Sequence, residues 1–186
     1  MTDSIEILEG QLRECYGRVV YTHKTQESCA DILMEKNRLI RFWQILLSAL
    51  VTGGIFGTFS EEWKSVAGVT SAILSTTLLA LNSYTKDHDL GEIAQKHRQA
   101  AASIWLVREK YLNLLTDLRG RNISVDDCRI SRDTLLGELH AAYTGSPSTD
   151  YKAYQRARNA LKRAEDMTFS DEEIDAFLPK ELKRKR

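Results

Sequence analysis

Two long runs without a charged residue interrupt a chain that is otherwise dense in Lys, Arg, Asp and Glu. Residues 42–60, "FWQILLSALVTGGIFGTFS", form the first run, and residues 65–85, "SVAGVTSAILSTTLLALNSYT", form the second. As helices they would extend about 28 and 31 Å, which matches a hydrocarbon core of about 30 Å. The pattern predicts two transmembrane helices joined by a short external turn at residues 61–64.

The residues that flank the two runs favour membrane insertion and predict an orientation. Aromatic side chains (Phe42, Trp43, Trp63 and Tyr84) stand at the ends of the runs, as they do at membrane–water interfaces. The turn "EEWK" carries one Lys and two Glu, whereas basic residues gather on the opposite sides of both runs. By the positive-inside rule, we expect a multi-pass membrane protein with both termini in the cytoplasm. The basic residues are Lys24, Lys36, Arg38, Arg41, Lys86, Lys96 and Arg98.

A helical hairpin buried in a soluble bundle is the alternative to membrane insertion. The second run keeps this alternative open because nine of its residues are Ser, Thr or Asn. The length of both runs, their flanking aromatics and the charge asymmetry together favour the membrane. Recovery of the protein in the cytosol without detergent would exclude insertion.

Outside the uncharged runs, apolar residues recur at alternating steps of four and three, the seam of a coiled coil. One seam predicts a stalk helix over residues 1–41, and a second predicts another over residues 86–119. Because no proline precedes Pro147, the first helix is expected to continue into the first span without a break. The expected fold is an all-α membrane protein, whose transmembrane hairpin continues into an antiparallel cytoplasmic stalk. The seams are Ile5, Leu8, Leu12, Cys15, Val19, Thr22, Gln26, Cys29, Leu33, and Leu90, Ile93, His97, Ala101, Ile104, Arg108, Tyr111, Leu115, Leu118.

Residues 120–186 are expected to form a C-terminal cytoplasmic helical region with a basic tail. Ser124 can cap a helix that reaches about Tyr143, and a second helix is predicted over about residues 149–167. Ser170 and Glu173 form a capping-box pattern before a short last helix that ends near Pro179. Five of the last seven residues, "KELKRKR", are Lys or Arg.

Each predicted span carries a polar stripe and, separately, a row of small residues spaced four apart. Small residues at this spacing let helix backbones approach closely in lipid. The stripes suggest a homo-oligomer around a water path, because two spans are too few to enclose a pore. In the competing interpretation the hydroxyl groups only bond carbonyl groups of the preceding turn. The pore-lining candidates are Gln44, Ser48, Thr52, Ser71, Ser75 and Asn82, and the helix-packing candidates are Ala49, Gly53, Gly57, Gly68, Ala72, Thr76 and Ala80.

The charge and composition of the chain exclude several classes of function. The formal net charge of +0 excludes a general polyanion binder, so no direct DNA binding is expected, and the three cysteines form no CxxC pair. The sequence contains no metal-ligand spacing, nucleophile elbow or Walker loop, so we expect no metal, no cofactor and no enzymatic activity. A weak candidate is an anionic nucleotide site, with a solvated helix face or contact with anionic lipid as the alternatives. Its residues are Tyr151, Lys152, Tyr154, Arg156 and Arg158.

The arrangement of helices resembles the SLATT group, the two-transmembrane effectors associated with SMODS and SLOG proteins. The most specific stretch, residues 138–161, is "ELHAAYTGSPSTDYKAYQRARNAL", which is similar to the region that links the group's last two larger helices. The segments "NRLIRFWQILLSALVTGGIF" and "NSYTKDHDLGEIAQKHRQAA" stand where the family has its span boundaries. The resemblance covers essentially the entire chain and contains no catalytic signature.

This resemblance implies a role in bacterial conflict systems, including antiphage defence by abortive infection. It implies an effector that perturbs the inner membrane after a nucleotide second messenger, or a sensor, synthase or reverse-transcriptase protein encoded nearby, activates it. The leading hypothesis is therefore a regulated oligomeric pore or membrane-disrupting effector. The alternative is a non-conducting membrane anchor or scaffold, whose cytoplasmic helices recruit a partner.

Overall fold

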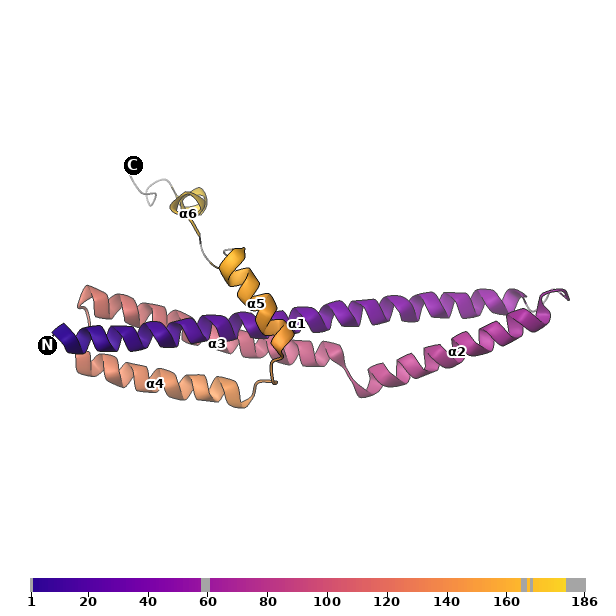
Figure 1. The fold of residues 1–186 in the computed structure, drawn as a ribbon, viewed down its shortest axis with the longest axis horizontal. Coiled ribbons are helices and arrows are strands. Elements are labelled where there is room, and N and C mark those ends of the chain that lie inside the picture. Colours follow the sequence, from indigo (N-terminus) through magenta and orange to yellow (C-terminus); the bar gives the residue numbers. More distant parts are fainter. Residues whose placement is uncertain (1, 58–60, 165–166, 168, 180–186) are drawn as a thin grey trace.

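The computed structural model of the protein describes residues 2–57, 61–164, 167 and 169–179. Within these residues the chain is helical and contains no strand, which confirms the predicted all-α fold (Figure 1). The helices are α1 Thr2–Gly57, α2 Lys64–Asp87, α3 Leu90–Gly120, α4 Val125–Thr144, α5 Tyr151–Arg163 and α6 Asp171–Phe177.

Helix α1 is a single helix of 56 residues, about 84 Å long, which runs the length of the molecule in Figure 1. Its first part has no proline and carries ion pairs one turn apart, such as Arg13 with Glu9 at 3.6 Å and Arg18 with Glu14 at 3.1 Å. The predicted continuity between the first stalk helix and the first uncharged run is confirmed. Any rotation of the stalk part of α1 is therefore transmitted along an unbroken helix.

The stalk consists of α1 and α3, which run antiparallel, with α4 packed along one side of the pair (Figure 1). Most predicted seam residues are buried. At the end of the first seam, however, the buried residue is Ile32 and not the predicted Leu33. The stalk has one large apolar core, whose most buried side chains are Leu12, Val19, Ile104, Tyr111 and Cys128.

The prediction of a second stalk helix over residues 86–119 is wrong about where that helix starts. Helix α2 continues to Asp87, the chain breaks at His88, and α3 begins at Leu90. The Asp89 side chain accepts a hydrogen bond from the Glu92 backbone N–H at 3.0 Å, so it caps α3 instead of lying inside one long helix. This break lets α3 pack on α1 while α2 diverges from it (Figure 1).

In the C-terminal region, the predicted caps of α4 by Ser124 and of α6 by Ser170 with Glu173 are confirmed. The helix predicted over residues 149–167 is shorter than expected. Asp150 accepts from the Ala153 N–H at 2.7 Å and so starts the helix at Tyr151. Helix α5 packs on α1 through Ala153 and Ala157, which are fully buried. The predicted basic tail lies outside the described residues, which end at Pro179.

Candidate functional site

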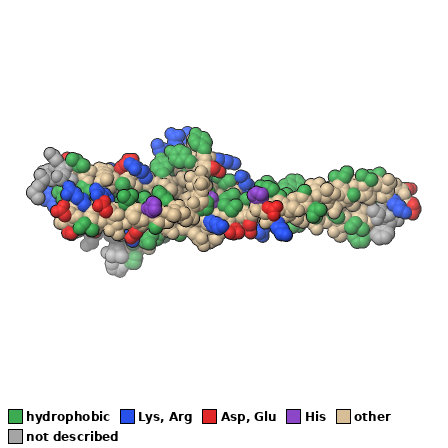
Figure 2. Space-filling model, turned by 90° about the horizontal axis from the view of Figure 1, so that it is seen from below, with side chains coloured by type: hydrophobic (Ala, Val, Ile, Leu, Met, Phe, Trp, Pro, Cys, Tyr) green, Lys and Arg blue, Asp and Glu red, His purple; other side chains and the backbone are tan. Residues whose placement is uncertain are grey.

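The hairpin formed by α2 and the last part of α1 exposes apolar side chains along its length. Ile45, Phe56 and Leu79 are 71%, 69% and 67% exposed. Both helices are long and apolar enough to cross a membrane, and their most apolar windows are 0% buried within the chain. Figure 2 shows that charged side chains at this end of the molecule reappear only near the tip. A hairpin buried in a soluble bundle would have a protein cover, which the described chain does not supply.

The two spans pack through one face of each helix. Half-buried positions in α1 include 44, 47, 51 and 54, and those in α2 include 71, 74, 78, 81 and 85. At the end of the hairpin near the stalk, the contact is polar. The Gln44 amide nitrogen donates to Asn82 Oδ1 at 2.9 Å and to Thr85 Oγ1 at 3.1 Å. Two predicted pore-lining residues, Gln44 and Asn82, therefore hold the hairpin together.

A groove with both apolar and polar lining runs along one flank of the hairpin, and we call it the polar groove after the four polar side chains in it. It brings together four of the six pore-lining candidates, Gln44, Ser48, Thr52 and Asn82, with Ile45, Ala49 and Leu78. The Thr52 hydroxyl donates to the Ser48 carbonyl at 3.0 Å, so this side chain satisfies its own helix, as the competing interpretation expects. Ser71 points instead toward Gly54, and Ser75 is exposed outside this groove.

Gly54 lies against Ser71 of the other span, although the four-residue spacing of small side chains does not single out this glycine. A Cβ at Gly54 would lie under 3.0 Å from Ser71 Oγ, whereas a Cβ at Gly53 or Gly68 would meet no atom within 4 Å. The Ser71 hydroxyl is buried and has no hydrogen-bond partner among the described residues. Ala72, Thr76 and Ala80 line a shallow groove on the outer face of α2. The small-residue rows thus point mainly away from the partner span.

The family model that describes the SMODS and SLOG-associating 2TM effector domain, family 4, matches residues 8–173 of the chain. The chain belongs to this family. No curated protein and no solved structure matches it. Membership in the SLATT family makes the protein a two-transmembrane effector of conflict and antiphage systems. The matched range includes both spans, the stalk and the capping box of α6.

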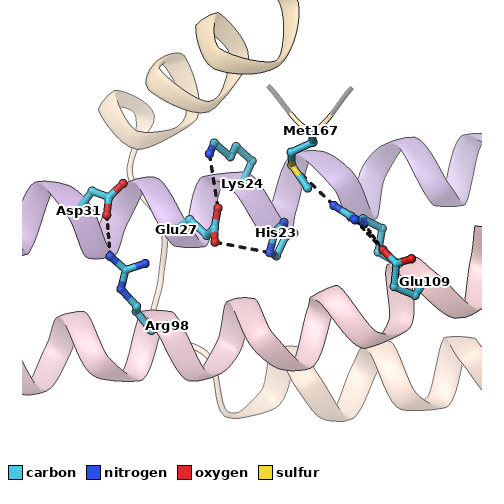
Figure 3. A network of polar contacts seen from close by, with 8 residues as sticks. His23, Lys24, Glu27, Asp31, Arg98, Glu109 and Met167 are labelled. Carbon is cyan, nitrogen blue, oxygen red and sulfur yellow. Dashed lines mark hydrogen bonds and ion pairs between the residues drawn. The ribbon is translucent and has the colours of Figure 1, made fainter. Parts of the chain in front are cut away.

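A buried polar layer divides the apolar contacts of the SLATT stalk. His97 is 4% exposed, and its Nδ1 lies 2.5 Å from Gln26 Oε1. The Gln26 amide nitrogen donates to the Pro147 carbonyl at 3.3 Å, so the layer ties α1 and α3 to the turn before α5. His23, 6% exposed, lies one turn away, with its Nε2 3.8 Å from Glu27 (Figure 3).

Burial lowers the pKa of both histidines below the ordinary value of 6.5. Asp150 opposes this effect at His97, and Glu27 opposes it at His23. The neutral imidazoles are therefore the form that suits the packed stalk. As the pH falls below 6.5, unfolded chains bind protons before folded ones, so the stalk loses stability until the lowered folded pKa is reached.

The weak ligand candidates of the SLATT chain lie on α5. Arg156 forms a two-pronged ion pair with Glu35 of α1, at 2.8 and 3.1 Å, which lowers the pKa of the Glu35 carboxyl. Tyr154 lies 6.2 Å, ring to ring, from Tyr21. These two side chains attach α5 to α1. Tyr151, Lys152 and Arg158 are exposed, as expected for a solvated helix face.

Proposed function

We propose that this SLATT effector is not an enzyme and that its hairpins assemble into an oligomeric pore in the bacterial inner membrane. A nucleotide signal or a partner protein activates it. The observation that carries this proposal is the polar groove along the flank of an otherwise apolar hairpin.

The groove supports assembly because polar groups that face hydrocarbon cost free energy unless they find partners. Within the described chain, the Gln44 amide donates two hydrogen bonds across the hairpin. Ser48 and Thr52 face outward along the same groove, although the Thr52 hydroxyl already donates to the Ser48 carbonyl within α1. Several copies that turn this flank inward would remove the polar side chains from lipid and surround a water path with them.

The charges at the two ends of the hairpin support an orientation with both termini in the cytoplasm. Arg38, Arg41 and Lys86 lie at the stalk end, whereas the tip carries Glu61 and Glu62 with Lys64. A signal that favours one packing of the stalk over another would rotate the groove through α1, since that helix is continuous. A proline in place of Asn37 breaks α1 between stalk and span and should uncouple the two.

Dye release from vesicles tests the proposal. The full-length protein is reconstituted at increasing protein-to-lipid ratio into vesicles that contain a quenched dye, and we expect release that rises steeply with that ratio. Thr52→Val should reduce the release, because it removes a hydroxyl from the groove.

Thr77→Val is the matched control. The Thr77 hydroxyl donates to the Ile73 carbonyl at 2.9 Å, just as the Thr52 hydroxyl donates to the Ser48 carbonyl. Thr77, however, lies on the outer face of α2, away from the groove. Equal release from both variants would refute the role of the groove. A protein that inserts and forms an oligomer but releases no dye under activating conditions would favour the anchor alternative.

A further inference from the structure

A groove runs between α1 and α3 on the side of the stalk that α4 does not cover. Two cavities lie in line along it. The one nearer the hairpin is lined by His23, Glu27, Arg98, Trp105 and Arg108, and the farther one by Arg13, Tyr16, Leu112, Leu115 and Arg119. At about 100° per residue, the α1 residues of both cavities fall within one sector of roughly 100°. The two cavities therefore lie along the same face of the α1–α3 pair, and we call this face the groove.

Two residues that follow α5 already line the first cavity. Met167 and Phe169 belong to its lining, and Arg108 Nη1 donates to Met167 Sδ at 3.7 Å (Figure 3). Met167 has a φ of 68°, a left-handed conformation that is uncommon for a residue with a long side chain. The chain thus turns at Met167, against the groove.

Helix α6 begins two residues after Phe169 and has the chemistry that fits the rest of the groove. Its sequence "DEEIDAF" carries four carboxylates and two apolar side chains, Ile174 and Phe177, which are 43% and 83% exposed. The second cavity offers Arg13 and Arg119 around the half-exposed side chain of Leu112. Glu9 also lines this cavity and pairs with Arg13 at 3.6 Å, so the lining keeps a net positive charge through Arg119. The acidic and apolar groups of this short helix thus complement the net basic charge and the apolar side chains of the second cavity.

The reach also matches. Along α3, Leu112 lies seven residues beyond Trp105, about 10 Å, and α6 is seven residues long, about 10 Å as well. A chain held at Phe169 beside Trp105 can therefore lay α6 over the second cavity without stretching. In Figure 1, α6 and α4 lie on opposite sides of the α1–α3 pair, so α4 does not block this path.

We propose that the groove between α1 and α3 is the docking site for α6 of the same chain, which closes over the stalk as a strap. The docked strap covers Leu112 and pairs its carboxylates with Arg13 and Arg119. It holds α1 and α3 together and keeps their open face from a second stalk. The contact is independent of whether the hairpin forms a pore.

Disulfide cross-linking in the purified full-length protein tests this docking. Leu112→Cys and Phe177→Cys are combined and oxidised mildly with copper phenanthroline. Ile130→Cys with Phe177→Cys is the matched control, since Ile130 is 65% exposed but lies on α4, on the other side of the stalk. Phe177→Cys alone controls for reaction with the native cysteines. We expect a cross-link within one chain for the first pair and not for the controls.

Charge variants give a second readout that does not depend on the geometry of the disulfide. Arg13→Glu with Arg119→Glu should lower the yield of the cross-link roughly five-fold, and Asp171→Arg with Asp175→Arg in the same protein should restore much of it. Cross-links between chains would show that a second copy supplies α6 and would overturn docking within one chain. No cross-link above the controls would overturn the docking altogether. Dye release by the unmodified protein is unaffected by either result, so the two proposals fail separately.

Discussion

Replacing Gly54 by Ala adds a methyl group where α1 lies against Ser71 of α2. The new Cβ would lie under 3.0 Å from Ser71 Oγ and 3.7 Å from Ser71 Cβ, whereas ordinary contacts begin near 3.4 Å. Either the Ser71 hydroxyl rotates away, or the spans separate by more than a few tenths of an ångström. Overpacking costs about 1–3 kcal/mol, and the lower half of this range applies here because the clashing atom ends a side chain that can rotate.

Gly53→Ala is the matched control, because a Cβ there meets no atom within 4 Å. Alanine favours a helix over glycine by up to about 1 kcal/mol, so this variant should be neutral or slightly more stable. The free energies of unfolding of the two variants should therefore differ by roughly 2 kcal/mol.

The assay is unfolding of the purified protein in mixed micelles by increasing dodecyl sulfate, followed by tryptophan fluorescence. Combining Gly54→Ala with Ser71→Ala should recover most of the loss, since the clashing hydroxyl is then absent. Equal stability of Gly53→Ala and Gly54→Ala would refute the packing of Gly54 on Ser71. A double variant no more stable than Gly54→Ala would place the clash elsewhere.

Three further predictions concern polar contacts. In a double-mutant cycle, Gln44→Leu and Asn82→Leu should show a coupling energy of about 0.6–1.7 kcal/mol in micelles, and additive losses would contradict their hydrogen bond. Thermal melting between pH 7.5 and 5.5 should show a loss of stability of up to about 1.4 kcal/mol per pH unit for each buried histidine. His97→Gln should flatten this slope, and an unchanged slope would contradict the burial of the His97 imidazole in the stalk. Arg156→Ala should lower the free energy of unfolding by less than about 1 kcal/mol, because the ion pair of Arg156 with α1 is exposed. A larger loss in chemical denaturation would show that the pair does more than attach α5.

Much of the fold could be predicted because each part carries its own periodic signal. The two uncharged runs define the hairpin by their length, and the four-three steps define the stalk. The caps at Ser124 and Ser170 follow from local hydrogen bonding, which depends on only three or four neighbouring residues. Asp89 is a residue that can cap a helix, and in the structure it caps α3. An aspartate at the membrane exit is equally suited to a solvated helix surface, so the sequence alone does not predict the break before α3.

The candidate site depends on information that no single run contains. The face that each span turns to the other is set by how α2 is rotated against α1. The spacing of small residues therefore selected Gly53, whereas the structure places Gly54 against the other span. The helical projection did place Gln44, Ser48 and Thr52 on one side, and the structure adds Asn82 from the other span. The groove between α1 and α3 joins residues more than sixty positions apart in the sequence, and only the packed stalk brings them together.

Cysteine accessibility in the membrane tests the central claim, that the polar groove lines a water path, most directly. Ser48→Cys is reconstituted into vesicles, and ion flux is recorded before and after a charged thiol reagent that does not cross lipid. Ile73→Cys, on the outer face of α2, and the unmodified protein serve as controls. We predict that the reagent reduces the flux through Ser48→Cys and leaves both controls unchanged. A flux that persists unaltered in Ser48→Cys, or falls equally in Ile73→Cys, would contradict the account.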